Sequence, residues 1–397
     1  MLKPFSDRVS GVQPSAIREI LKFTADPEVI SFAAGNPAPE AFPVEEIAKL
    51  SAEIFREEPV NALQYSITEG YPKLREWLKD DLTKKGLFRE GEQVVITSGA
   101  QQAIETTAKI LCNEGDVIIC EDPAFVGSLN AFRSYGVKLA GVPMDSDGMI
   151  PEILEETLRA NPTAKFIYTI PNFQNPTGKT TTLARRREIL ALAEKYGVYI
   201  LEDNPYGALR FAGEDVPSIK ELDTKGNVLY CGTFSKTLAP GLRVGYLVGA
   251  AEIVSKAVVG LQTSTVHTNI WAQMLTWRFL TTVDFDEHLK KLRAIYRHKC
   301  GLMLEGLSAE LPDFIEFTHP EGGLFIWATL PDKYDMNSFC RGAVQRKVAV
   351  VPGNAFTADE NAVSHSFRLN FSTPTDEQIE KGVVILGKAA KELLKEL

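Results

Sequence analysis

The sequence has little cysteine. Five cysteines stand among 397 residues, an odd number, and no two of them have the CxxC spacing. These counts favour neither a disulfide framework nor a cysteine zinc cluster, and we expect no metal site. We interpret the thiols as small buried hydrophobic groups. They are Cys112, Cys120, Cys231, Cys300 and Cys340.

Long apolar runs are also lacking. No window reaches the roughly 18 uninterrupted apolar residues that a membrane-spanning helix needs. The first residues, MLKPFSDRVS, lack the apolar run of roughly 7–15 residues that marks a signal peptide. We therefore expect a cytoplasmic protein without a membrane partner.

The chain has no excess of positive charge. It carries 43 Lys and Arg against 52 Asp and Glu, a formal net charge of −9. Nucleic acids and anionic membranes favour basic surfaces, so the balance favours a small-molecule ligand over either partner. No repeat or low-complexity tract is present, and 44% hydrophobic with 24% charged residues is typical of a globular protein of two domains at this length.

Short apolar runs alternate with helical patterns between residues 92 and 250. The runs are QVVITSG, DVIICEDP, VKLAGVPM, AKFIYTIPN, VYILEDNP, NVLYCGTFS and VGYLVGA. Nearly continuous apolar strands indicate a sheet covered by helices on both faces, hence an α/β domain with a mainly parallel sheet. From about residue 286 the pattern changes to a long helix followed by GGLFIWATL, KVAVVPG, FRLNFST and a final helix, which predicts a second, α+β unit.

Ligands of such sheets bind beyond the carboxyl ends of the strands, so the residues there are candidates for a site. Gly99, Ala100 and Gln101 open a helix after the first run, and its first amides could bind an anion, although a glycine turn is common there. Asp203 ends another run and precedes Tyr206 by three residues; such an acid is equally often a turn residue. PNFQNPTGKT ends like a phosphate loop but has Phe173 where that motif needs glycine, which disfavours ATP.

Lys236 stands in GTFSKTLAPGLRVGY without a nearby acidic residue. A lysine that anchors a ligand covalently must lose its proton near neutral pH, and an environment poor in counter-ions favours this. Thr233, Ser235 and Arg243 could form a phosphate cradle. A lysine, a phosphate cradle and the carboxylate of Asp203 are together what pyridoxal 5′-phosphate requires.

These residues carry a resemblance. From about residue 15 onward the chain resembles the class I/II aminotransferases, which are pyridoxal-phosphate enzymes of fold type I, and within them the 2-aminoadipate and kynurenine aminotransferase branch. The motif S-K-x-x-x-P-G-x-R-x-G, read from Ser235 to Gly245, is specific, and SFAAGNPAPEAFP, ALQYSITEGY, NPTG and FRLNFS follow the same order. The resemblance implies a large domain with a seven-stranded sheet over residues 46–285 and a small domain over 286–397. Residues 1–45 would pack with the small domain.

The resemblance also implies roles at the cofactor. Lys236 would hold the cofactor as a Schiff base and move the substrate proton, and Asp203 would pair with the ring nitrogen. Tyr206 and Asn175 would bond the phenolic oxygen, although either could be an ordinary packing or turn residue. Phe125 would stack on the ring where relatives often have tyrosine. Ala100 stands where relatives commonly have serine or threonine, and Thr233 stands where serine is usual.

Substrate and partner residues follow from the same resemblance. Arg368 would bind the substrate α-carboxylate beneath a loop with Gly35 and Asn36, unless it is a solvated strand residue. Arg18 would lie near the substrate side chain, or else face solvent in a first helical turn. Tyr65 would reach the cofactor phosphate of a neighbouring subunit in a homodimer. The STVHTN loop could cross the same interface, but a lone histidine such as His267 is more often structural.

The predicted activity is transfer of an amino group from an L-amino acid to a 2-oxo acid such as 2-oxoglutarate by a ping-pong mechanism. The donor could be 2-aminoadipate-like, dicarboxylic or aromatic. A carbon–sulfur lyase or decarboxylase with the same cofactor is the alternative among enzymes. An aminotransferase-like regulatory module is the alternative outside them, but the resemblance begins near Ser15 and leaves no room for a DNA-binding extension.

Overall fold

A seven-stranded sheet forms the centre of the computed structural model, which describes Ser6, Arg8 and residues 26–393. The strands lie in the order β2-β8-β7-β6-β5-β3-β4. Their bounds are β2 (Glu92–Thr97), β3 (Val117–Asp122), β4 (Lys138–Pro143), β5 (Ala164–Thr169), β6 (Tyr199–Asp203), β7 (Val228–Thr233) and β8 (Gly245–Ala250). β8 runs antiparallel to both of its neighbours, and the other six strands run in one direction. The seven predicted strands and the mainly parallel α/β fold are therefore confirmed.

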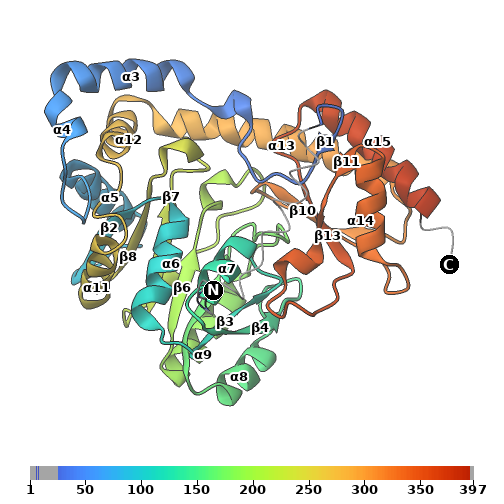
Figure 1. Ribbon diagram of the computed structural model, residues 1–397, viewed down its shortest axis with the longest axis horizontal. Coiled ribbons are helices and arrows are strands. Elements are labelled where there is room, and N and C mark those ends of the chain that lie inside the picture. Colours follow the sequence, from blue (N-terminus) through green and yellow to red (C-terminus); the bar gives the residue numbers. More distant parts are fainter. Residues whose placement is uncertain (1–5, 7, 9–25, 394–397) are drawn as a thin grey trace, which may run out of the picture.

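Helices cover both faces of this sheet, which is why its strands are continuously apolar. Successive residues of β3 show the two faces: Ile118 packs in one hydrophobic cluster with Ile104 and Leu129, whereas Ile119 packs in another with Leu154. Figure 1 shows the helices around the sheet. They are α3 (Val44–Glu57), α4 (Pro59–Leu63), α5 (Pro72–Lys84), α6 (Ala100–Leu111), α7 (Val126–Arg133), α8 (Pro151–Ala160), α9 (Leu183–Tyr196), α10 (Ile219–Leu222), α11 (Ala251–Gln262) and α12 (Ile270–Thr282). We call this sheet with its helices the large unit.

The C-terminal part forms a second, antiparallel sheet, which confirms the predicted smaller α+β unit. Its order is β12-β13-β10-β9, with β9 (Glu316–Phe317), β10 (Phe325–Thr329), β12 (Val351–Pro352) and β13 (Ser366–Asn370). Helices α14 (Met336–Gln345) and α15 (Asp376–Leu393) complete this small unit, and α13 (Phe285–Glu310) runs across both units.

The predicted strand KVAVVPG is split by Val350 into two short strands. β11 (Val348–Ala349) pairs in parallel with β1 (Ile30–Ser31), whereas β12 pairs with β13. The predicted strand is interrupted because its two halves join different sheets. The pairing places residues 30–31 beside the small unit, while the predicted domain boundaries at 45/46 and 285/286 stay predictions.

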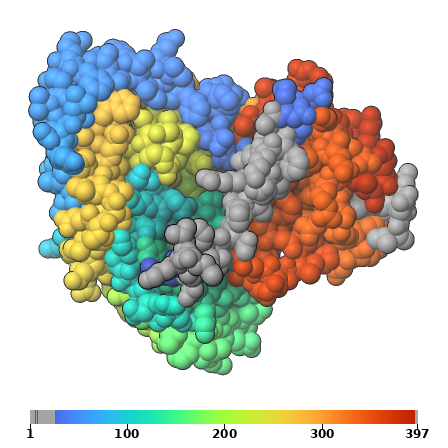
Figure 2. Space-filling model, viewed as in Figure 1, coloured from blue at the N-terminus to red at the C-terminus, as the bar shows by residue number. Residues whose placement is uncertain are grey.

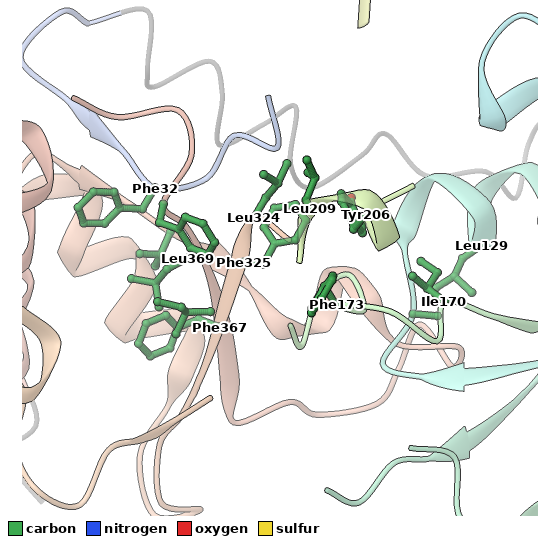
Figure 3. Packing of buried hydrophobic residues seen from close by; sticks show 14 of the residues in the cluster. Phe32, Leu129, Ile170, Phe173, Tyr206, Leu209, Leu324, Phe325, Phe367 and Leu369 are labelled. Carbon is green, nitrogen blue, oxygen red and sulfur yellow. The ribbon is translucent and has the colours of Figure 1, made fainter. Parts of the chain in front are cut away.

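One hydrophobic cluster continues from the large unit into the small one. Figure 3 follows it from Phe367 and Phe325 in the small unit to Leu129 and Ile170 in the large unit. The two units accordingly lie against each other in the space-filling view of Figure 2. The walls of a cavity between the two units are therefore held in place by the hydrophobic cluster that the units share.

Within the part of the chain that is described, no helix combines the length and apolar character needed to cross a bilayer. The same residues contain no group of three or more His, Cys, Asp or Glu side chains arranged to hold a metal ion. The cellular compartment stays a prediction.

Candidate active site

A cavity of about 330 Å³ lies at the carboxyl ends of the central strands and reaches the small unit. Thirteen of the residues singled out in the sequence line it: Gly35, Asn36, Ala100, Gln101, Phe125, Asn175, Asp203, Tyr206, Thr233, Ser235, Lys236, Arg243 and Arg368. These residues come from segments far apart in the chain, so the fold rather than local sequence brings them together.

Lys236 follows β7 and points its amine into this cavity. Its Nζ donates a hydrogen bond to the carbonyl oxygen of Gly35 at 2.9 Å. Burial, together with the positive charges of Arg368 and Arg243, lowers the pKa of the amine to about 8. A buried amine of this kind loses its proton near neutral pH and can then act as a nucleophile.

Asp203 is the last residue of β6 and is buried. Its Oδ2 accepts a hydrogen bond from Tyr168 Oη at 2.9 Å, whereas its Oδ1 has no partner within the described structure. Burial raises the pKa of the carboxyl to about 7, and the bond from Tyr168 opposes this rise. A buried carboxylate oxygen without a donor is costly, so the cavity suits a ligand that brings an N–H to it.

The predicted phosphate cradle is formed by two turns. Gly99, with φ of 73°, ends the turn before α6, and Arg243 has φ of 53°. Arg243 donates from Nη2 to the carbonyl oxygen of Ser98 at 3.0 Å and from Nη1 to Ser235 Oγ at 3.4 Å. A Cβ at position 99 would lie 2.4 Å from Arg243 Nη2, so only glycine admits this approach. The helix amides, the guanidinium and the hydroxyls offer donors that could bind an anion, as predicted for the phosphate.

Tyr206 and Asn175 lie together across the cavity from the cradle. Asn175 Nδ2 donates to Tyr206 Oη at 3.5 Å, and both side chains are buried. Burial raises the pKa of the Tyr206 phenol, so the hydroxyl keeps its proton and can donate it in a hydrogen bond. The Tyr206 ring packs edge-on against Phe325, with centroids 5.8 Å apart.

Arg368 of β13 is only 1% exposed, so its interpretation as a solvated strand residue is wrong. It donates from Nη1 to Asn175 Oδ1 and from Nη2 to the carbonyl oxygen of Ala33, both at 2.8 Å, while Nε has no partner within the described structure. Burial lowers its pKa to about 10. No described carboxylate forms an ion pair with it, and a buried cation without a counter-ion suits an anionic ligand.

Sequence reasoning missed several residues of this site. Phe325 lies 4.2 Å from the Arg368 guanidinium, ring centroid to Cζ, and Ile104 and Ile170 also line the cavity. Tyr168, the hydrogen-bond donor to Asp203, is in the middle of an apolar run and looks like a core residue. The one feature that could have indicated its role is that β5, which carries Tyr168, lies next to β6, which carries Asp203.

Two of the predicted residues that the structure describes, Gly99 and Tyr65, do not line the cavity. Gly99 lies beside the guanidinium of Arg243 in the turn before α6. Tyr65 is 82% exposed and packs edge-on against His267, with centroids 5.9 Å apart. Arg18 lies outside the described residues.

The residues fit pyridoxal 5′-phosphate. Lys236 offers a nucleophilic amine to its aldehyde, the free Oδ1 of Asp203 offers an acceptor to its ring nitrogen, and the cradle at Arg243 offers donors to its phosphate. Fold and site together define a protein of the pyridoxal-phosphate type.

The chain belongs to the aminotransferase class I and II family, whose model matches residues 27–386. It is 38% identical to aromatic-amino-acid aminotransferase 1 of Thermococcus litoralis, over 99% of this chain and 95% of that protein. The structure of kynurenine aminotransferase of Pyrococcus horikoshii, in complex with PMP, has a TM-score of 0.94 and 38% identity over 98% of each chain. The alpha-aminoadipate aminotransferase of Thermus thermophilus, complexed with N-(5′-phosphopyridoxyl)-L-leucine, has a TM-score of 0.90 and 37% identity over 99% of this chain and 98% of that one. The protein is a pyridoxal-phosphate-dependent aminotransferase, as the resemblance implied.

Proposed function

We propose that the protein transfers the amino group of a large L-amino acid, either dicarboxylic or aromatic, to a 2-oxo acid such as 2-oxoglutarate. The observation that carries this proposal is the buried Arg368, which pairs with no carboxylate among the described residues and lines the same cavity as Lys236. The related enzymes named for aromatic amino acids, kynurenine and alpha-aminoadipate support the choice of substrate class.

Arg368 would bind the α-carboxylate of the amino acid. Asn175 and the carbonyl of Ala33 hold its guanidinium in place, and the rings of Phe325 and Phe356 lie 4.2 and 5.0 Å from its Cζ. A fork held by packing loses little conformational freedom when it binds a carboxylate. Gly35 and Asn36 lie at the same end of the cavity and would cover the bound group.

When bound, pyridoxal 5′-phosphate supplies an aldehyde that condenses with amines and a ring that withdraws electrons. Lys236 would hold it covalently, yield to the substrate amine and then move the proton at the substrate Cα, for which a pKa near 8 is suitable. Asp203 would accept the N–H of the ring, and Tyr206 and Asn175 would donate to its phenolic oxygen. Phe125 would pack on its face.

A panel of amino donors with 2-oxoglutarate tests this proposal. We expect formation of the donor's 2-oxo acid only when the acceptor is present, with 2-aminoadipate, kynurenine and aromatic amino acids among the best donors. Release of ammonia, sulfide or carbon dioxide without the acceptor would instead support the lyase or decarboxylase alternative. Activity confined to small aliphatic donors would contradict the proposed substrate class.

We also propose that two copies of the chain form the active unit. Apolar side chains are exposed together around α4, and we call Phe55, Val60, Leu63, Tyr65 and Ile67 the α4 patch. Phe55, Leu63 and Tyr65 also line a groove with His267 and Trp271. The groove joins the patch to the STVHTN loop, so a second copy seated there would bury both segments, and Tyr65 could reach the partner's cradle.

A further inference from the structure

A chain of two hydrogen bonds supports the carboxylate of Asp203 from the side away from the cavity. Ser128 Oγ donates to Tyr168 Oη at 2.7 Å, and Tyr168 Oη donates to Asp203 Oδ2 at 2.9 Å. Ser128 and Tyr168 have no exposed surface and Asp203 is 2% exposed. The three residues come from α7, β5 and β6, so the chain links a helix to two neighbouring strands.

This arrangement decides which carboxylate oxygen is left free. Because Oδ2 is occupied by Tyr168, Oδ1 is the oxygen left without a partner. Two other neighbours interact with the carboxyl: the charge of Glu121 raises its pKa, and Cys231, opposite Asp203 in the register of β6 and β7, lowers it. A thiol is a weak donor, so the phenol is the main polar support of a buried charge.

The Tyr168 ring would be held in place even without its hydroxyl. It packs edge-on against Phe132, with centroids 5.3 Å apart. The hydroxyl is therefore not needed to fill space, and in a buried apolar setting an unpaired hydroxyl would be destabilising. The pairing with Ser128 and Asp203 removes that cost and gives the hydroxyl a direction.

We propose that Tyr168 is a positioning residue for Asp203, and that Ser128 orients Tyr168 so that its proton points to Oδ2. The phenol would keep the carboxylate ionised and its free oxygen aimed at the cofactor ring nitrogen. Helix α7 would then serve the cofactor twice, because Phe125 at its start lines the cavity and Ser128 orients the phenol. This inference rests on the role proposed for Asp203.

The substitution Tyr168→Phe tests it, because it removes only the hydroxyl. We expect the dissociation constant of pyridoxal 5′-phosphate, measured by fluorescence titration of the apoprotein, to rise about tenfold or more. We also expect the infrared band of the protonated Asp203 carboxyl in the apoprotein to persist to higher pH than in the wild type. Asp203→Asn identifies that band by its absence.

Two further variants separate positioning from general damage. Tyr196→Phe removes a phenol hydroxyl on α9 that bonds Glu155, and it should change neither readout. Ser128→Ala should shift both in the same direction as Tyr168→Phe but by less. In the Tyr168→Phe background it should add nothing, because Ser128 acts through the phenol.

An unchanged dissociation constant and an unchanged infrared titration in Tyr168→Phe would overturn the inference. A full effect of Ser128→Ala in the Tyr168→Phe background would do the same. If Tyr168→Phe does not fold, the two readouts of Ser128→Ala decide. Asp203→Asn separates the role of Asp203 from that of Tyr168. Unchanged cofactor binding in Asp203→Asn refutes the role of Asp203 itself. Weakened binding in Asp203→Asn with normal binding in Tyr168→Phe refutes only the positioning role of Tyr168.

Discussion

Arg368 Nη1 donates to Asn175 Oδ1 at 2.8 Å, which joins a strand of the small unit to the NPTG loop of the large unit. The same asparagine donates from Nδ2 to Tyr206 Oη. The proposed carboxylate-binding group and the proposed cofactor-binding groups are thus held by one side chain.

Replacing Arg368 by lysine should weaken substrate binding. Lysine keeps the positive charge but loses the two-donor fork, so we expect KM for the amino donor to rise about tenfold or more, with the dissociation constant of the cofactor nearly unchanged. Steady-state kinetics and cofactor titration measure the two quantities. Arg341→Lys, at an exposed ion pair with Asp335, is the matched control. An unchanged KM would remove Arg368 from the role.

Lys236 should bind the cofactor covalently at a lower pH than a lysine of ordinary pKa would. Its lowered pKa, about 8, predicts that the rate of cofactor loading into the apoprotein rises with pH with a midpoint near 8 and levels off above it, since only the neutral amine attacks an aldehyde. Stopped-flow absorbance measures this rate. After borohydride reduction Lys236→Ala should carry no covalently attached cofactor, whereas the exposed Lys195→Ala should carry it as the wild type does. A loading rate that still climbs steeply toward pH 10 would contradict the prediction.

The burial of Asp203 should destabilise the apoprotein as the pH rises. The pKa of this carboxyl is raised from 3.8 to about 7, so between these pH values the folded protein keeps a proton that the unfolded chain has lost. The contribution of Asp203 to the free energy of unfolding is therefore full below pH 3.8 and decreases up to about pH 7, by on the order of a few kcal/mol. Urea unfolding of apoprotein and apo-Asp203→Asn across this range measures the difference. A difference independent of pH would refute it.

The sequence predicted the site best where its residues are close together in the chain. Lys236, Ser235 and Arg243 stand within one turn-rich motif, and the turn between β7 and β8 gathers them. Asp203 could be placed because it ends a strand. Tyr168 could not be placed, because the sequence does not show which group of the neighbouring strand its buried hydroxyl contacts. The resemblance predicted Arg368 for the site, but the residues alone left a solvated arginine open, because its burial depends on Phe325 and Phe356 from other segments.

The α4 patch should mediate self-association. Leu63 is 75% exposed, and Leu63→Asp would place a charge inside a dimer interface, so we expect monomers at concentrations where the wild type is dimeric. Sedimentation velocity measures the change. Val363→Asp is the matched control, because Val363 is an equally exposed apolar residue, at 77%, but lies in the small unit. A wild type that is monomeric, or a Leu63→Asp variant that stays dimeric, would refute this interface.

The hydrophobic cluster that passes between the units bears on how the chain can be divided. Helix α13 contributes Tyr296 and Met303 to it, together with Phe166 of the large unit and Leu369 of the small unit. Cutting the chain at the start of α13 would give two fragments, each of which exposes hydrophobic residues that are buried in the intact protein. Neither fragment would be expected to survive as an independent domain, and heating the intact chain should melt both units in a single cooperative step.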